Sequence, residues 1–176
     1  MSRFREDPLL GIARIILTIA LGIIVVAGAA ILLALPVVGL FHGKIVAELV
    51  ADGTPANAYW ALIALMVLGV GALALTFFFI RHLRRIVLTV ADGDPFVPVN
   101  ATRLISMAWL ALGVWVVGIP IRATGTWLES VTEGGSIQVG VGEGGGMSLA
   151  LVLTLFILAR VFRKGAAMRE DLEGTV

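Results

Sequence analysis

The sequence contains no cysteine, and it has only two histidines and one tyrosine in 176 residues. Without cysteine the chain forms no disulfides, has no thiolate nucleophile and holds no cysteine-ligated zinc or iron–sulfur site. Charged residues are also scarce, at 14% of the chain against the roughly 25% that is usual for soluble domains. Hydrophobic residues make up 59%, and the mean hydropathy is +1.04. This composition predicts a protein that lies in a lipid bilayer.

Groups suited to catalysis or cofactor binding are few. His42 and His82 are expected on opposite sides of the membrane, which argues against a shared metal or haem. The serines lack the glycine-rich turn and the histidine partner of a hydrolase nucleophile. The apolar stretches carry no ionisable group at their centres, where transporters and pumps place them. We therefore predict a non-enzymatic protein with no catalytic residue, no cofactor and no metal. The net charge of +1 gives no reason to expect direct nucleic-acid binding.

Four apolar stretches approach the roughly 20 residues that a helix needs to cross a bilayer. The predicted spans are at about 12–38, 57–80, 103–121 and 147–163, and residues 1–176 form a single transmembrane domain. The first stretch is much longer than the core of a cleavable signal peptide, about 7–15 residues, so it is interpreted as a retained helix. The predicted fold class is all-α, an integral membrane four-helix bundle.

The basic residues are distributed unevenly along the chain. Only Lys44 and Arg122 fall in the segments between spans one and two and between spans three and four. Loops rich in lysine and arginine face the cytoplasm, so both termini and the middle loop are predicted to be cytoplasmic. Eleven of the thirteen basic residues lie in or beside these three segments: Arg3, Arg5, Arg14, Arg81, Arg84, Arg85, Arg103, Arg160, Arg163, Lys164 and Arg169.

The connections around the second span carry start and stop signals. Residues 44–52 place apolar positions at helical spacing opposite charged ones, which predicts a short amphipathic helix on the outer surface. Thr54 followed by Pro55 predicts the start of the second transmembrane helix near the proline. Helical spacing continues to Val90, and Asp92-Gly93-Asp94-Pro95 is expected to end that helix.

The third and fourth spans have less definite ends. Asn100, close after Pro98, is expected to cap the third helix, and Pro120 with Arg122 is expected to close it. The glycine-rich outer loop between helices three and four, residues 134–146, fits a short hairpin and a disordered loop equally well.

The most distinctive string is Asp92-Gly93-Asp94-Pro95-Phe96-Val97-Pro98, which joins the second and third spans. One interpretation is a docking loop, in which two prolines hold the turn rigid and present an apolar anchor and two carboxylates to a protein partner. The other is a plain connector, because turn chemistry by itself explains the glycine and the prolines. Both interpretations stay open at the level of sequence.

A basic cluster lies at the cytoplasmic end of the second span, at Arg81, His82, Arg84 and Arg85. Such a cluster can bind anionic lipid headgroups or an acidic partner surface, at roughly 1 kcal/mol per basic residue. The orientation of the helices in the membrane accounts for it equally well and is the favoured explanation.

Three strings stand out at the helix ends: Leu83-Arg84-Arg85-Ile86, then Asp92 to Pro98 with Asn100, and the tail Val161-Phe162-Arg163-Lys164-Gly165-Ala166 with its acidic close. Together they resemble a family of bacterial membrane proteins catalogued as domain of unknown function 2975. Members of that family often carry acidic residues where this chain has Val99-Asn100 and Arg160. The resemblance implies a four-helix protein of the bacterial inner membrane, often encoded beside a small helix-turn-helix regulator that it sequesters or modulates.

Our leading hypothesis is a multi-pass protein of the bacterial cytoplasmic membrane that binds a cytoplasmic transcriptional regulator. The alternatives are a small ligand-binding or permeation module and a structural subunit of a membrane complex. Small residues in the first span, such as Gly22 and Gly28, permit close helix packing and self-association. The candidate partner-binding residues are Arg84, Arg85, Asp92, Asp94, Phe96, Arg103 and Arg163.

Overall fold

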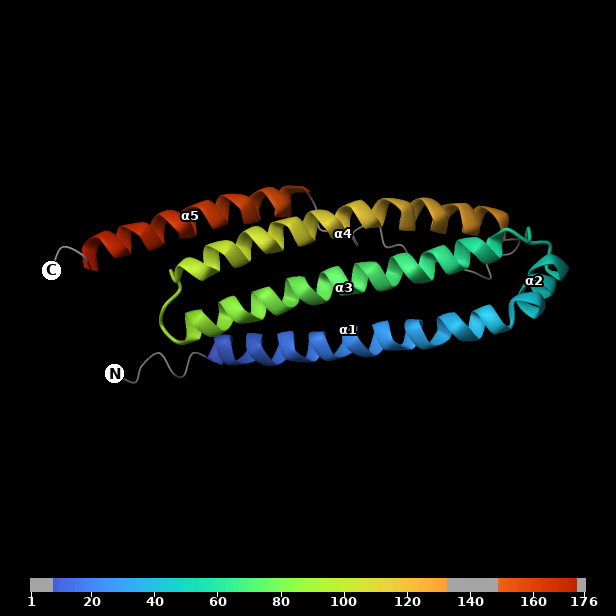
Figure 1. Cartoon of the computed structure of the whole chain (residues 1–176), viewed down its shortest axis with the longest axis horizontal. Helices are drawn as coiled ribbons and strands as arrows, with labels where there is room; N and C mark the ends of the chain where they lie inside the picture. The colour runs from blue at the N-terminus through green and yellow to red at the C-terminus, as the bar shows by residue number, and fades with distance from the viewer. Residues whose placement is uncertain (1–7, 133–148, 174–176) are drawn as a thin grey trace.

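The computed structural model describes residues 8–132 and 149–173, and every regular element in these ranges is a helix. The four longer helices run alongside one another, and the short α2 lies at one end (Figure 1). The expected all-helical fold class is confirmed. In chain order the helices are α1 (Pro8–Leu40), α2 (His42–Ala51), α3 (Ala58–Ala91), α4 (Pro98–Val131) and α5 (Leu149–Glu173).

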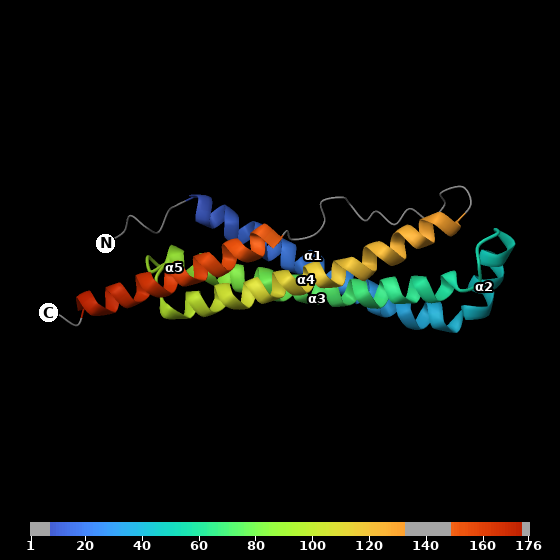
Figure 2. The same ribbon diagram turned by 90° about the horizontal axis from the view of Figure 1, so that it is seen from above.

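The four long helices form a row rather than a closed bundle. α3 packs between α1 and α4, and α5 packs against α4. Within the described residues the backbone of α1 approaches neither α4 nor α5, and the backbone of α5 does not approach α3. Seen from above, the row is twisted, with α1 crossing the direction of the other helices (Figure 2). A row leaves each outer helix with a wide apolar face that suits lipid contact.

Three helices, α1, α3 and α4, are long and apolar enough to cross a membrane. They contain 33, 34 and 34 residues. At 1.5 Å per residue each is about 50 Å long, which exceeds the roughly 30 Å hydrocarbon core of a bilayer, so their ends extend beyond it. In α5 the apolar run Leu149–Ala159 is followed by four basic residues. A fourth crossing and the cytoplasmic location of the termini stay predictions.

The core lies where α3, α4 and α5 meet. Ala108 and Ala111 of α4 have no exposed surface, and Met107, which precedes Ala108, is 2% exposed. The small side chains of α4 allow its neighbours to come close, as expected where packing rather than expulsion of water drives helix association. α1 contains no buried residue. The core residues are Phe79, Ile86, Leu104, Met107, Ala108, Ala111, Val152, Leu155 and Ala159.

Several local predictions are confirmed. Residues 44–52 fall almost entirely in α2, which is short and amphipathic. α3 ends at Ala91, and Gly93 after it has a φ of 87°, a left-handed conformation that favours glycine. The glycine-rich loop at 134–146 lies outside the described residues.

Three details of helix ends differ from expectation. α3 begins at Ala58, one turn after Pro55, because Ala58 N–H donates to the Pro55 carbonyl at 2.9 Å in a turn that precedes the helix. α4 continues through Pro120 to Val131. Proline removes one backbone donor, yet membrane helices tolerate this loss, and the buried Gly125 and Leu128 continue the packing of α4 beyond it. The third correction concerns Asn100 and is described below.

Candidate functional site at the basic end

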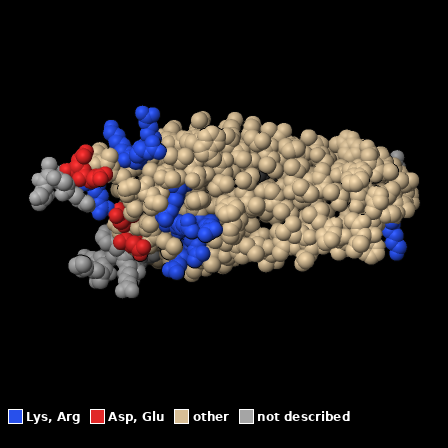
Figure 3. Space-filling model, viewed as in Figure 1, with Lys and Arg blue, Asp and Glu red and all other residues tan. Residues whose placement is uncertain are grey.

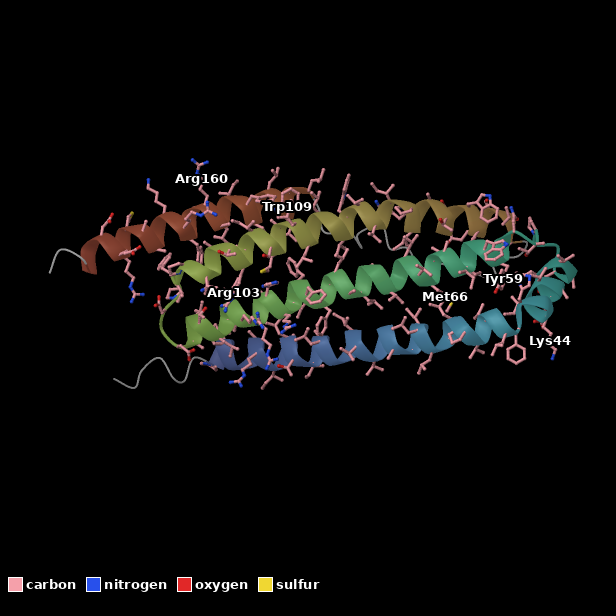
Figure 4. All side chains as sticks on the ribbon, viewed as in Figure 1. Lys44, Tyr59, Met66, Arg103, Trp109 and Arg160 are labelled. Atoms are coloured by element: carbon pink, nitrogen blue, oxygen red, sulfur yellow. The ribbon has the colours of Figure 1, made fainter. Side chains whose placement is uncertain are left out.

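The described cations gather at one end of the row, where α1 and α4 begin and α3 and α5 end. We call this the basic end. Lys44 is in α2 at the opposite end (Figures 3 and 4). Arg122 is in the second half of α4, which runs toward that end. The described N- and C-terminal helix ends also lie at the basic end (Figure 1). The nine described cations there are Arg14, Arg81, Arg84, Arg85, Arg103, Arg160, Arg163, Lys164 and Arg169.

The turn between α3 and α4 is closed by backbone hydrogen bonds. Gly93 N–H donates to the Val90 carbonyl at 3.0 Å, and Asp94 N–H donates to the Thr89 carbonyl at 3.1 Å. This pair of bonds satisfies carbonyls that the last turn of α3 would otherwise leave without partners. The turn is therefore an ordered extension of α3.

Asn100 is the polar centre of this junction and has no exposed surface. Its Nδ2 donates to Thr89 Oγ1 at 2.7 Å and to the Pro95 carbonyl at 3.0 Å. Its Oδ1 accepts from a guanidinium nitrogen of Arg103 at 2.9 Å, and the same nitrogen donates to the Arg85 carbonyl at 3.2 Å. One amide thus connects the end of α3, the turn and the start of α4.

The expectation that Asn100 caps α4 is wrong. Val97 occupies the N-cap position without a side-chain hydrogen bond, and Pro98 is at the first helical position. Proline has no backbone N–H, so one of the donors that a cap would satisfy is absent. The buried amide instead satisfies groups of the turn and of α3, which would be costly to bury unpaired.

The turn also holds α5. The rings of Phe96 and Phe162 pack with centroids 5.3 Å apart. A Cβ added at Gly165 would lie 2.8 Å from Phe96 Cδ1, so only glycine allows this close approach. Asp94 forms an ion pair with Arg169 near the end of α5. We call these five residues the turn–α5 clasp.

The seven residues predicted for partner binding all lie at the basic end, but they differ in their surroundings. Asp94, Phe96 and Arg103 make the internal contacts just described, although Phe96 remains 41% exposed. Arg84 is half-buried, and its Nε has no hydrogen-bond partner among the described residues. The side chains of Arg85, Asp92 and Arg163 are exposed.

The sequence analysis assigned no contact to Phe162, Gly165 and Arg169. It also gave Asn100 the wrong role, that of a helix cap. Gly165 offered a signal, because glycine inside a helix costs about 1 kcal/mol relative to alanine and often marks a close packing contact. Its neighbour across that contact, Phe96, is far away in the sequence and was not identifiable from spacing.

The two histidines lie apart. His42, the first residue of α2, packs its ring against Tyr59 at a centroid distance of 4.3 Å, whereas His82 is on α3 near the basic end. Among residues 8–132 and 149–173, no group of three histidine, cysteine or acidic side chains is placed to hold a metal ion.

Long apolar helices whose outer faces are exposed, with cations gathered at one end, indicate a helical membrane protein. The chain belongs to the family described as "Protein of unknown function (DUF2975)", which it matches over residues 45–176. The match confirms the family suggested by the sequence strings, and it covers both halves of the turn–α5 clasp. No curated protein matches the chain. No solved structure matches it either.

Proposed function

We propose that this protein is a non-enzymatic component of the bacterial cytoplasmic membrane whose basic end faces the cytoplasm and binds a regulatory protein. The uneven distribution of cations supports the orientation, because positively charged segments are retained on the cytoplasmic side. The family resemblance implies a helix-turn-helix regulator as the partner.

The observation that carries this proposal is the turn–α5 clasp. It joins the connection between α3 and α4 to the far end of the chain through the ring contact of Phe96 with Phe162 and the ion pair of Asp94 with Arg169. A surface that is ordered before binding loses less conformational entropy when a partner docks. The clasp therefore turns two separate segments into one preorganised surface.

The chemistry of this surface selects an acidic partner. Arg85 and Arg163 are exposed, and Phe96, at the same end of the molecule, keeps 41% of its surface accessible. Exposed cations favour an acidic patch, and the accessible part of the aromatic ring offers an apolar contact.

The test is co-purification of the tagged full-length protein from bacterial membranes in mild detergent. A soluble helix-turn-helix protein is expected to be recovered with the unmodified chain. The double variant Arg85→Glu with Arg163→Glu should reduce that recovery at least about tenfold, because repulsion at two positions costs more than 1.4 kcal/mol.

The matched control carries Lys44→Glu with Arg122→Glu, the same change of charge at the opposite end. It should recover the regulator as well as the unmodified chain does. Equal recovery by the two double variants contradicts a partner site at the basic end.

A further inference from the structure

An apolar groove runs between α1 and α3 halfway along the row. Its volume is about 320 Å³, it is open on one side, and all of its lining side chains are apolar. Gly28 and Ala29 form part of the α1 wall, and Ala74 and Phe77 form part of the α3 wall. The small residues keep the two helices from filling the space between them, so a narrow apolar chain can enter.

Helical periodicity places arginines in line with both walls. Eleven residues make three turns of an α-helix, so positions eleven apart share a face. On α3, Arg81, Arg84 and Arg85 follow the lining residues Val70, Leu73 and Ala74 by eleven residues each.

The same relation holds on the opposite wall. On α1, Arg14 precedes the lining residue Val25 by eleven residues. Because α1 and α3 run in opposite directions, both sets of arginines lie beyond the same end of the groove, the basic end (Figure 1). In the space-filling view a patch of lysine and arginine covers adjacent parts of α1 and α3 there (Figure 3).

These four guanidinium groups have no acidic partner within the described residues. The ion pair found there joins Asp94 to Arg169, which belong to the turn–α5 clasp. The Nε atom of Arg84 is buried and makes no hydrogen bond to any described residue. A buried donor atom without a partner is costly unless an acceptor from outside the chain meets it.

The distance along α3 from the groove to Arg84 matches the thickness of one leaflet of a bilayer. Ala74 lies near the middle of α3, and Arg84 follows it by ten residues. At 1.5 Å per residue the two levels are about 15 Å apart, which is half of the roughly 30 Å hydrocarbon core. A molecule with a charged group at the level of Arg84 and an acyl chain in the groove therefore reaches the middle of the bilayer.

We propose that the groove and the four arginines together form a binding site for one phospholipid with an anionic headgroup. An acyl chain occupies the groove between α1 and α3, and the headgroup phosphate accepts hydrogen bonds from Arg84 and its neighbours. Guanidinium groups suit this role because their planar donors bind phosphate oxygens in pairs.

A second copy of this chain is a poorer occupant of the groove. The helix with the most exposed apolar surface, α1, contains no acidic residue between Pro8 and Leu40. Its apolar side chains fit the groove but leave the four cations without neutralising charge. An anionic phospholipid satisfies both halves of the site.

The experiment uses the full-length protein reconstituted in vesicles of phosphatidylcholine with a minority of phosphatidylglycerol. The protein is extracted gently, and retained lipid is identified by native mass spectrometry. One phosphatidylglycerol is expected on each chain, with phosphatidylcholine not retained. If phosphatidylcholine is retained in the same amount as phosphatidylglycerol, the arginines do not select an anionic headgroup and the proposal is overturned.

Two variants test the arginines. Arg81→Gln with Arg84→Gln should weaken phosphatidylglycerol retention about 25-fold, since each basic residue near the membrane surface contributes about fivefold. The control, Arg160→Gln with Lys164→Gln, removes the same charge from α5, where Arg160 points away from the other helices (Figure 4). Equal retention by both double variants contradicts the proposal.

Two further variants test the groove. Gly28→Leu adds a side chain to the wall of the groove, where a Cβ meets no atom within 4 Å. Ala30→Leu adds the same side chain on the opposite side of α1. Only Gly28→Leu should lose the lipid, with helix content unchanged by circular dichroism. If Gly28→Leu instead changes the oligomeric state and leaves lipid retention intact, the groove is an interface between copies and the lipid site is refuted.

Discussion

Asn100 is fully buried at the junction of α3 and α4, although asparagine is more often a surface or capping residue. The sequence placed it correctly near the start of a helix. Its role was not predictable, because a cap and a buried hub need the same residue type at nearly the same position. Whether Asn100 caps the helix or is buried depends on where Thr89 and Arg103 lie. Their positions relative to Asn100 follow from the turn geometry.

The buried hydrogen bonds of Asn100 lead to a prediction about a single substitution. Asn100→Ala leaves the Pro95 carbonyl and a donor of Arg103 without their partner at a buried junction. The expected loss is about 2 kcal/mol in the free energy of unfolding, with a Tm lower by about 5 °C. Thermal unfolding followed by circular dichroism in detergent measures it.

Asn57→Ala is the control for this loss. Asn57 is at the N-cap of α3, is exposed and makes no capping hydrogen bond through its side chain. The Tm of the Asn57→Ala variant should stay close to that of the unmodified chain. Equal Tm values for the two variants would show that the buried hydrogen bonds of Asn100 contribute nothing to stability.

At the scale of helices, α1 and α3 were the easiest to predict. Their long apolar runs leave no other structure that satisfies every backbone group in lipid, and turn residues mark the end of α3. α4 was harder, because Pro120 ends most helices in water but is accommodated in a membrane helix. The docking of α5 on the turn was not predictable, since Phe96 and Gly165 are in separate elements.

The turn–α5 clasp predicts a specific rescue. Gly165→Leu places a side chain into Phe96, so the free energy of unfolding should fall by about 1–3 kcal/mol, as is typical of overpacking. Adding Phe96→Ala removes the obstructing ring. The free energy of unfolding of the double variant should therefore fall by less than the sum of the losses measured for the two single variants. The measurement is thermal or denaturant unfolding of all three variants.

Gly22→Leu provides the comparison for a leucine in a helix without obstruction. A Cβ at Gly22 meets no atom within 4 Å, and leucine has the higher helix propensity. This variant should be as stable as the unmodified chain. Strict additivity of Gly165→Leu and Phe96→Ala would mean that α5 does not pack on the turn.

At the scale of the whole molecule, the sequence predicted helices and the clustering of cations but not the neighbours of each helix. Binary patterns identify an apolar segment, whereas in lipid both a row and a bundle bury apolar surface, either against protein or against acyl chains. The arrangement then depends on small residues such as Ala108 and Ala111, which allow α3, α4 and α5 to share one core. No such contact reaches α1, which packs on α3 alone among the long helices.

The orientation of the row in the membrane gives the last prediction. Because the chain has no cysteine, single cysteines introduced at Asp92 and Lys44 report the two ends of the molecule without background. Both positions are exposed. In intact cells a membrane-impermeant maleimide should label Lys44→Cys, and it should label Asp92→Cys only after the membrane is permeabilised, because segments rich in basic residues are retained on the cytoplasmic side. Labelling of Asp92→Cys in intact cells would show that the row has the opposite orientation in the membrane. The partner of the basic end would then be extracytoplasmic, whereas the phospholipid site would only move to the other leaflet.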